Sequence, residues 1–93
     1  MAVVFFIPGY LLPFTANQGR VELGVSPGTV GEALEALWRA HPGVRDRVVD
    51  EGGRVRQHLN VFAGAESIRY TGGLATPLPD GTEISIVPAV SGG

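Results

Sequence analysis

Hydrophobic residues in the first quarter of the chain fall into two short patterns that are typical of strands. Residues 2–7 (Ala-Val-Val-Phe-Phe-Ile) form a continuous apolar run that Pro8-Gly9 closes. The run is short and rich in β-branched and aromatic residues, so it predicts a buried strand. Residues 20–25 alternate polar with apolar side chains and predict a half-buried strand. Residues 10–19 form a long connection between the two strands of this predicted hairpin.

A helical pattern follows at Thr29-Val30-Gly31-Glu32, which matches the capping box. In that motif the threonine oxygen accepts from an amide three residues on, and the glutamate reaches back to the cap. Apolar residues then recur at helical spacing on one face, and His41-Pro42-Gly43 is expected to end the helix. The residues of this face are Val30, Ala33, Leu34, Leu37 and Trp38.

The second half of the chain predicts three more strands. Residues 44–57 are charged, with one helical turn expected around residues 45–49. Residues 59–63 predict a strand, residues 67–70 a short edge strand, and residues 83–88 a strand entered through an Asp80-Gly81 turn. This order fits an α+β fold in which one main helix crosses a mixed sheet of about four to five strands, the β-grasp or ubiquitin-like arrangement. We expect residues 1–88 to form this domain and residues 89–93 to form a flexible tail.

Composition excludes several classes of function. The net charge of −2 comes from scattered acidic and arginine side chains, without the basic stripe that nucleic-acid binding needs. The chain has no cysteine, which excludes disulfides and thiolate chemistry, and no lysine. The apolar run at residues 2–7 is too short for a signal-peptide core or a membrane span. These features predict a cytoplasmic protein that binds neither nucleic acid nor membrane.

The chain ends in Ser91-Gly92-Gly93, directly after the last predicted strand. Glycine has no Cβ, so a diglycine end passes through a narrow channel and presents an unhindered carboxylate. A five-residue tail from Ala89 reaches roughly 17 Å when extended, which is enough to enter a neighbouring active site. The pattern indicates a carboxyl terminus that serves as a reagent; an ordinary chain end is the alternative.

Several motifs together resemble the ubiquitin-like sulfur carriers of the MoaD/ThiS family, especially the CysO-type carriers of cysteine biosynthesis. The resemblance covers nearly the whole chain, and its C-terminal block is the most specific part because loop, turn, strand and diglycine occur in the family's order. The motifs are Ile7-Pro8, Thr29-Val30-Gly31, Leu59-Asn60-Val61, Gly72-Gly73-Leu74-Ala75-Thr76, Asp80-Gly81 and the end of the chain from Ile86 to Gly93.

The resemblance implies a carrier that is not itself an enzyme and binds no cofactor or metal. An E1-like activating enzyme would use ATP to adenylate Gly93, sulfide or a persulfide would displace AMP, and Gly93 would then bear a thiocarboxylate. Gly92 would keep the tail thin enough for the activating channel. For the cysteine pathway the resemblance implies a sulfur-accepting synthase that uses pyridoxal phosphate and a metalloprotease that releases the product.

Several acceptors of the sulfur are consistent with the sequence. The small subunit of molybdopterin synthase has the same tail chemistry, and thiamine and thiolated tRNA are other destinations of the sulfur. A modifier conjugated to target lysines and a plain interaction module are rivals of a different class. The length of segment 44–57 favours the cysteine-type carrier.

The first strand is apolar on both faces, and one helix covers only one of them. Phe6, Phe62, Val87 and Pro88 are therefore predicted to form an exposed apolar patch near the start of the tail. We expect this patch to bind the activating enzyme, together with the tail residues Ala89, Val90 and Ser91. The alternatives are that residues 10–19 fold over the patch or that the strand has the opposite phase.

Other polar residues have weaker patterns. Arg54 and Arg56 either dock an acidic partner surface or simply face water, as exposed arginines usually do. His41 and His58 have no carboxylate motif beside them and do not define a catalytic or metal site. Gly72-Gly73 predicts a turn, because it lacks the strand and helix context of a phosphate-binding loop.

Overall fold

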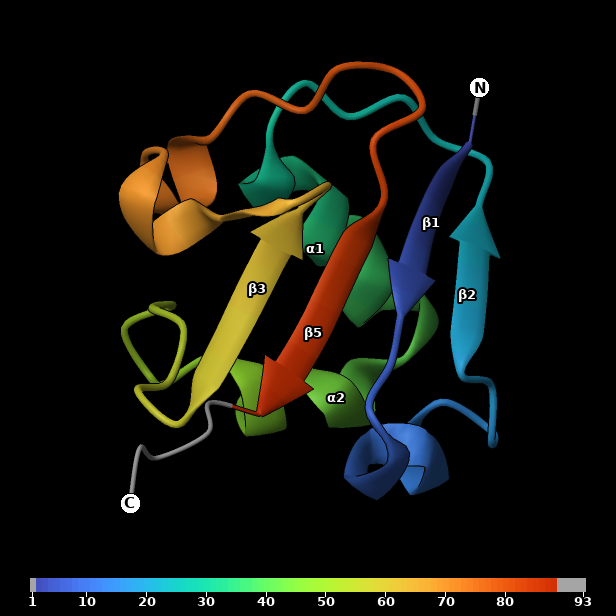
Figure 1. Ribbon diagram of the computed structural model, residues 1–93. Coiled ribbons are helices and arrows are strands. Elements are labelled where there is room, and N and C mark those ends of the chain that lie inside the picture. Colours follow the sequence, from blue (N-terminus) through green and yellow to red (C-terminus); the bar gives the residue numbers. More distant parts are fainter. Residues whose placement is uncertain (1, 89–93) are drawn as a thin grey trace.

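The computed structural model describes residues 2–88, and in them a five-stranded mixed sheet packs against two helices. The strands lie in the order β2-β1-β5-β3-β4, and Figure 1 shows α1 crossing one face of the sheet. The helices and strands are β1 (Val3–Phe6), β2 (Arg20–Leu23), α1 (Val30–Ala40), α2 (Pro42–Val48), β3 (Leu59–Ala63), β4 (Glu66–Ser67) and β5 (Ile84–Pro88). Three short 3-10 helices join them, at Gly9–Phe14, Ile68–Tyr70 and Gly73–Ala75.

The neighbouring strands β1 and β5 are parallel, and every other neighbouring pair is antiparallel. A parallel pair requires a crossover connection, which α1 and the rest of the chain between β1 and β5 supply. This topology confirms the predicted β-grasp fold. It also places the last strand in the middle of the sheet, where hydrogen bonds hold it on both sides.

The core lies between the sheet and the helices. Val3 and Phe5 of β1 and the following Ile7 are buried, as the predicted strand phase requires. They pack with the apolar face of α1, in which Val30, Ala33, Leu34 and Leu37 are buried and Trp38 is half-buried.

The capping box at the start of α1 is present with one change. Thr29 Oγ1 accepts a hydrogen bond from the Glu32 amide at 3.2 Å, as predicted. The Glu32 carboxylate, however, accepts from the amide of Gly28 at 2.7 Å rather than from Thr29 itself. The glutamate thus reaches one residue beyond the cap and ties the incoming loop to the first turn of the helix.

The chain after α1 differs from the prediction. His41 ends α1 as expected, but α2 begins immediately at Pro42 and continues to Val48, so the single turn predicted at residues 45–49 starts earlier and is longer. Proline is tolerated in the first turn of a helix because its missing N–H has no partner there. Val44 and Val48 are fully buried, which anchors α2 to the core.

The edge strand predicted at residues 67–70 was largely wrong. Strand β4 contains only Glu66 and Ser67, and the chain then turns into a 3-10 helix in which Ile68 is buried. Ser67 Oγ accepts from the Arg69 amide at 3.3 Å, which favours this turn over an extended strand. The predicted turn at Asp80-Gly81 is confirmed, with Gly81 at a φ of 85°, a conformation that suits glycine.

Candidate functional site

The end of β5 defines where the predicted tail leaves the domain. Pro88 is the last residue of β5 and pairs with Leu59, the first residue of β3. In Figure 1 this end lies at the lower edge of the sheet, where α2 and the 3-10 helix Gly9–Phe14 also lie. The predicted site residues Ala89, Val90, Ser91, Gly92 and Gly93 lie outside the described residues. Their attachment point, Pro88, is paired with β3 only, because β1 pairs with Ile84 and Ser85 at the start of β5.

Three residues of the predicted apolar patch, Phe6, Phe62 and Val87, lie on the sheet face opposite α1. Phe6 pairs with Ser85, and Ser85 pairs with Phe62, so the two aromatic side chains lie on one face with a serine between them. Phe6 is 37% exposed, Phe62 and Val87 are half-buried, and Pro88 is exposed. We call Phe6, Phe62 and Val87 the open-face patch, and Figure 1 shows no helix over this side of the sheet. Pro88, which was predicted to belong to the patch, pairs with the fully buried Leu59, so its strand phase directs it to the opposite face.

The loop between β1 and β2 does not cover this patch. Its 3-10 helix packs against α2, with Leu11 fully buried. The guanidinium of Arg47 lies over the Phe14 ring, 4.5 Å from its centroid, and links the loop to α2. The burial of Val3 and Phe5 also excludes the opposite strand phase. Both structural alternatives to an exposed patch are therefore removed.

Sequence reasoning missed two residues beside the patch. Ser85 lies at its centre and makes it less continuous than a run of aromatic residues would be. Tyr70, which is 85% exposed, lines a hollow of about 400 Å³ together with Phe62 and Asn60. No local pattern reveals these neighbours, because strand register and the turn after β4 bring them together.

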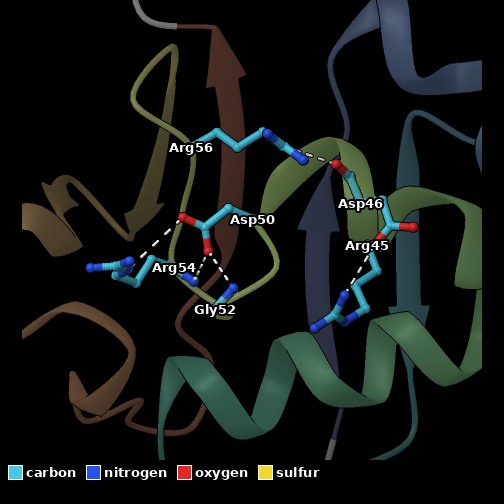
Figure 2. A network of polar contacts seen from close by, with 6 residues as sticks. All are labelled: Arg45, Asp46, Asp50, Gly52, Arg54 and Arg56. Carbon is cyan, nitrogen blue, oxygen red and sulfur yellow. Dashed lines mark hydrogen bonds and ion pairs between the residues drawn. The ribbon is translucent and has the colours of Figure 1, made fainter.

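Hydrogen bonds to Asp50 organise the first part of the connection between α2 and β3. Asp50 Oδ1 accepts from the amides of Gly52 and Arg54 at 2.9 and 3.0 Å (Figure 2). The hydrogen bond from the Arg54 amide is the main cause that lowers the pKa of Asp50, because it stabilises the charged carboxylate. The Arg54 side chain remains exposed and lies 3.8 Å from Asp50 Oδ2. Arg56 instead donates through Nε to the backbone oxygen of Asp46 at 2.9 Å, so the two arginines occupy different surroundings.

The two histidines lie apart from any cluster of ligands. His41 caps the C-terminal end of α1, and His58 is exposed just before β3. Within residues 2–88, no three histidine, aspartate or glutamate side chains gather in a way that would hold a metal ion. In the same part of the chain, neither helix is long and apolar enough to cross a membrane.

The fold defines the class of protein: a ubiquitin-like β-grasp domain whose last strand, β5, lies in the middle of the sheet. A sequence model of the ThiS family matches residues 11–93. The chain belongs to the ThiS family of ubiquitin-like sulfur carriers and modifiers.

Individual relatives support this assignment over the full length. The sulfur carrier protein CysO of Mycobacterium tuberculosis is 35% identical over 95 residues, with all of both chains covered. A chain in the crystal structure of the Amycolatopsis orientalis BexX/CysO complex superposes with a TM-score of 0.85 at 32% identity and covers 98% of this chain and 99% of that one. The crystal structure of SAMP1 from Haloferax volcanii, at 30% identity and complete coverage of both chains, gives a TM-score of 0.79.

Proposed function

We propose that this chain is a sulfur carrier that holds sulfur as a thiocarboxylate on Gly93. The observation that supports this most is the match to CysO over the entire chain, together with a family match that extends to the terminal Gly92-Gly93. The fold agrees with this role, because β5 leads from the middle of the sheet toward these residues. The chain acts as the substrate of one enzyme and the sulfur donor for the next.

Activation follows from the chemistry of a carboxylate, which is a poor electrophile. An E1-like enzyme binds ATP and the tail, a carboxylate oxygen of Gly93 attacks the α-phosphorus, and pyrophosphate leaves. Hydrosulfide then attacks the carbonyl carbon of the acyl-adenylate, the bond to AMP breaks, and the proton of the hydrosulfide is lost. The product is a protein thiocarboxylate, so a chain with no cysteine carries sulfur.

The folded domain serves to present the tail. Partner enzymes bind the open-face patch, which positions the neighbouring tail residues Ala89, Val90 and Ser91 at the entrance of the active site. Gly92 and Gly93 then enter the channel, where the absence of side chains allows close approach. Residues 1–88 provide the surface that partner enzymes bind, and residues 89–93 carry the reactive carboxylate.

The acceptor of the sulfur is a synthase that makes cysteine or a related sulfur metabolite. Such a synthase uses pyridoxal phosphate to generate an electrophile that the thiocarboxylate attacks, and a metalloprotease then frees the product from the tail. ATP, pyridoxal phosphate and the protease metal all belong to the partners. The support for this assignment of the acceptor is the similarity to CysO, a sulfur carrier protein.

Intact-mass measurement tests the carrier chemistry. The purified chain is incubated with ATP, sulfide and the activating enzyme of its own host, beside a variant that lacks Gly93. We expect a mass gain equal to the replacement of one oxygen by sulfur in the full chain and none in the shortened one. An unchanged mass, with an activating enzyme shown to work on another carrier, would contradict the proposal.

A second candidate is a protein modifier, which the similarity to small archaeal modifier protein 1 favours. That relative, from Haloferax volcanii, is 42% identical over 65 residues, or 70% of each chain. As a modifier, the activated Gly93 would form an isopeptide bond with lysines of target proteins. The chain itself has no lysine and cannot form polymers through lysine side chains. Tail-derived remnants on lysines of host proteins, found by mass spectrometry, would support this role.

A further inference from the structure

A basic hollow lies at the end of the domain from which the tail emerges. It has a volume of about 460 Å³ and lies between the loop after β1, the helix α2 and the residues just before β3. We call it the tail-root hollow. Its polar and aromatic lining consists of Tyr10, Phe14, Asp46, Arg47, Arg56 and His58.

One side of this hollow lies next to the end of β5. Strand β5 lies between β1 and β3, and its last residue, Pro88, pairs with Leu59. His58 immediately precedes Leu59. Tyr10, in the 3-10 helix after β1, lines the same hollow as His58. The hollow therefore begins one residue from the last pair of β5, and an enzyme that binds the chain beyond Pro88 lies close to it.

Two arginine side chains are held in place around the hollow. Arg56 uses Nε to donate to the Asp46 carbonyl oxygen at 2.9 Å, and within residues 2–88 its two terminal nitrogens make no hydrogen bond (Figure 2). Arg47 lies over the Phe14 ring. Because these contacts already restrict the two arginine side chains, the chain loses less side-chain entropy when a partner binds them.

The acidic group in the hollow does not cancel these charges. The carboxylate of Asp46 is paired with Arg45 at 3.0 Å. Arg47 and Arg56 thus leave the tail-root hollow positive on a chain whose net charge is −2. The rest of the surface would repel an acidic partner weakly, so this local charge selects how such a partner approaches.

We infer that the enzyme that activates the tail places an acidic segment, with aspartate or glutamate side chains, in the tail-root hollow against Arg47 and Arg56. This inference rests on the proposed function and adds the chemistry of the partner surface. The hollow is shallow and its arginines are exposed or half-buried, which suits a protein segment better than a small anion. Arg56 docks the partner, whereas Arg54 lies outside the hollow and does not.

Charge reversal with a matched control tests the inference. The variants are Arg47→Glu, Arg56→Glu and the double variant; the control is Arg54→Glu, which changes the net charge equally from the same connection. ATP–pyrophosphate exchange is followed against the concentration of the chain at several salt concentrations. We expect each reversal in the hollow to raise KM by about tenfold at low salt, with kcat changed by less than about twofold, and the control to leave KM within about twofold. Rising salt should raise KM for the unmodified chain and much less for the double variant.

Two outcomes would overturn the inference. One is an equal KM for Arg56→Glu, Arg47→Glu and the unmodified chain; the other is an equal loss for Arg54→Glu, which would show an effect of net charge alone. Neutral Arg47→Gln and Arg56→Gln variants give the same comparison if a reversed charge prevents folding, which circular dichroism would reveal. Failure of the proposed function is distinct: without activation the unmodified chain would show no exchange at all, and without sulfur transfer it would show exchange but no mass gain in the intact-mass assay.

Discussion

Phe6 provides the most direct test of the open-face patch. Its side chain is 37% exposed, and a phenylalanine has about 200 Å² of surface, so about 75 Å² remains for a partner to bury. At 25 cal/mol per Å² this area corresponds to about 2 kcal/mol of binding free energy, or about thirtyfold in affinity. That value is an upper limit, because binding also costs entropy.

The substitution Phe6→Thr removes the ring and keeps a β-branched residue in β1. The part of the ring that folding buries, about 125 Å², limits the loss of unfolding free energy to about 3 kcal/mol. A domain of this size has about 5–14 kcal/mol of stability, so the variant is expected to remain folded. Urea denaturation measures this loss separately from binding.

Val25 provides a matched control, because it is 36% exposed but lies at the other end of the sheet. It follows β2 beyond Leu23, which pairs with Val3 at the start of β1, whereas the tail starts at the end of β5. In the exchange assay we expect Phe6→Thr to raise KM for the activating enzyme by about ten- to thirtyfold. Val25→Thr should leave KM unchanged. A folded Phe6→Thr variant with the KM of the unmodified chain would refute the role of the patch.

Three further predictions concern the fold itself. Thr29→Ala removes the oxygen that accepts from the Glu32 amide and should lower the unfolding free energy by about 1 kcal/mol, or Tm by about 5 °C. Thr29→Ser should retain the cap. An unchanged Tm for the alanine variant would contradict the assignment of Thr29 as the cap. Leu34→Ala leaves a cavity at a fully buried position in α1 and should lower the unfolding free energy, measured in urea, by about 3 kcal/mol. Exposed Glu35→Ala is the control; an equally small loss for both variants would contradict the placement of Leu34 in the core. The pKa of Asp50 is lowered from 3.8 in the folded chain, so its stabilising effect is present above that pH and is lost as the pH falls through the folded pKa. The difference in unfolding free energy between the unmodified chain and Asp50→Asn should therefore shrink below about pH 4, and a constant difference would exclude this linkage.

Local patterns in the sequence predicted most of the fold. The strand phase at residues 2–7, the Thr29 cap and the glycine at position 81 each depend on side chains and backbone within a few residues of one another. Such signals are visible in the sequence because alternation, helical spacing and turn chemistry are short-range properties. The misassigned strand at residues 67–70 shows the limit, since burial of Ile68 and a local Ser67 hydrogen bond outweighed its strand propensity.

The site depended more strongly on long-range contacts. Apolar residues on both faces of the first strand predicted an exposed patch, but only the register of β1, β5 and β3 places Phe6 and Phe62 on either side of Ser85. The fold likewise brings Tyr10 and His58, which are 48 positions apart, into the lining of one hollow.

The sequence by itself determined the class of fold, the faces of the strands and the terminal diglycine that makes a reactive carboxylate possible. Only the tertiary structure decided that Arg56 joins Arg47 around the tail-root hollow while its neighbour Arg54 turns toward Asp50. Two arginines separated by one residue look equivalent in the sequence. They differ in the folded chain because one meets a backbone carbonyl of α2 and the other meets a local turn, and the path of the chain between those elements is set by the packing of the whole domain.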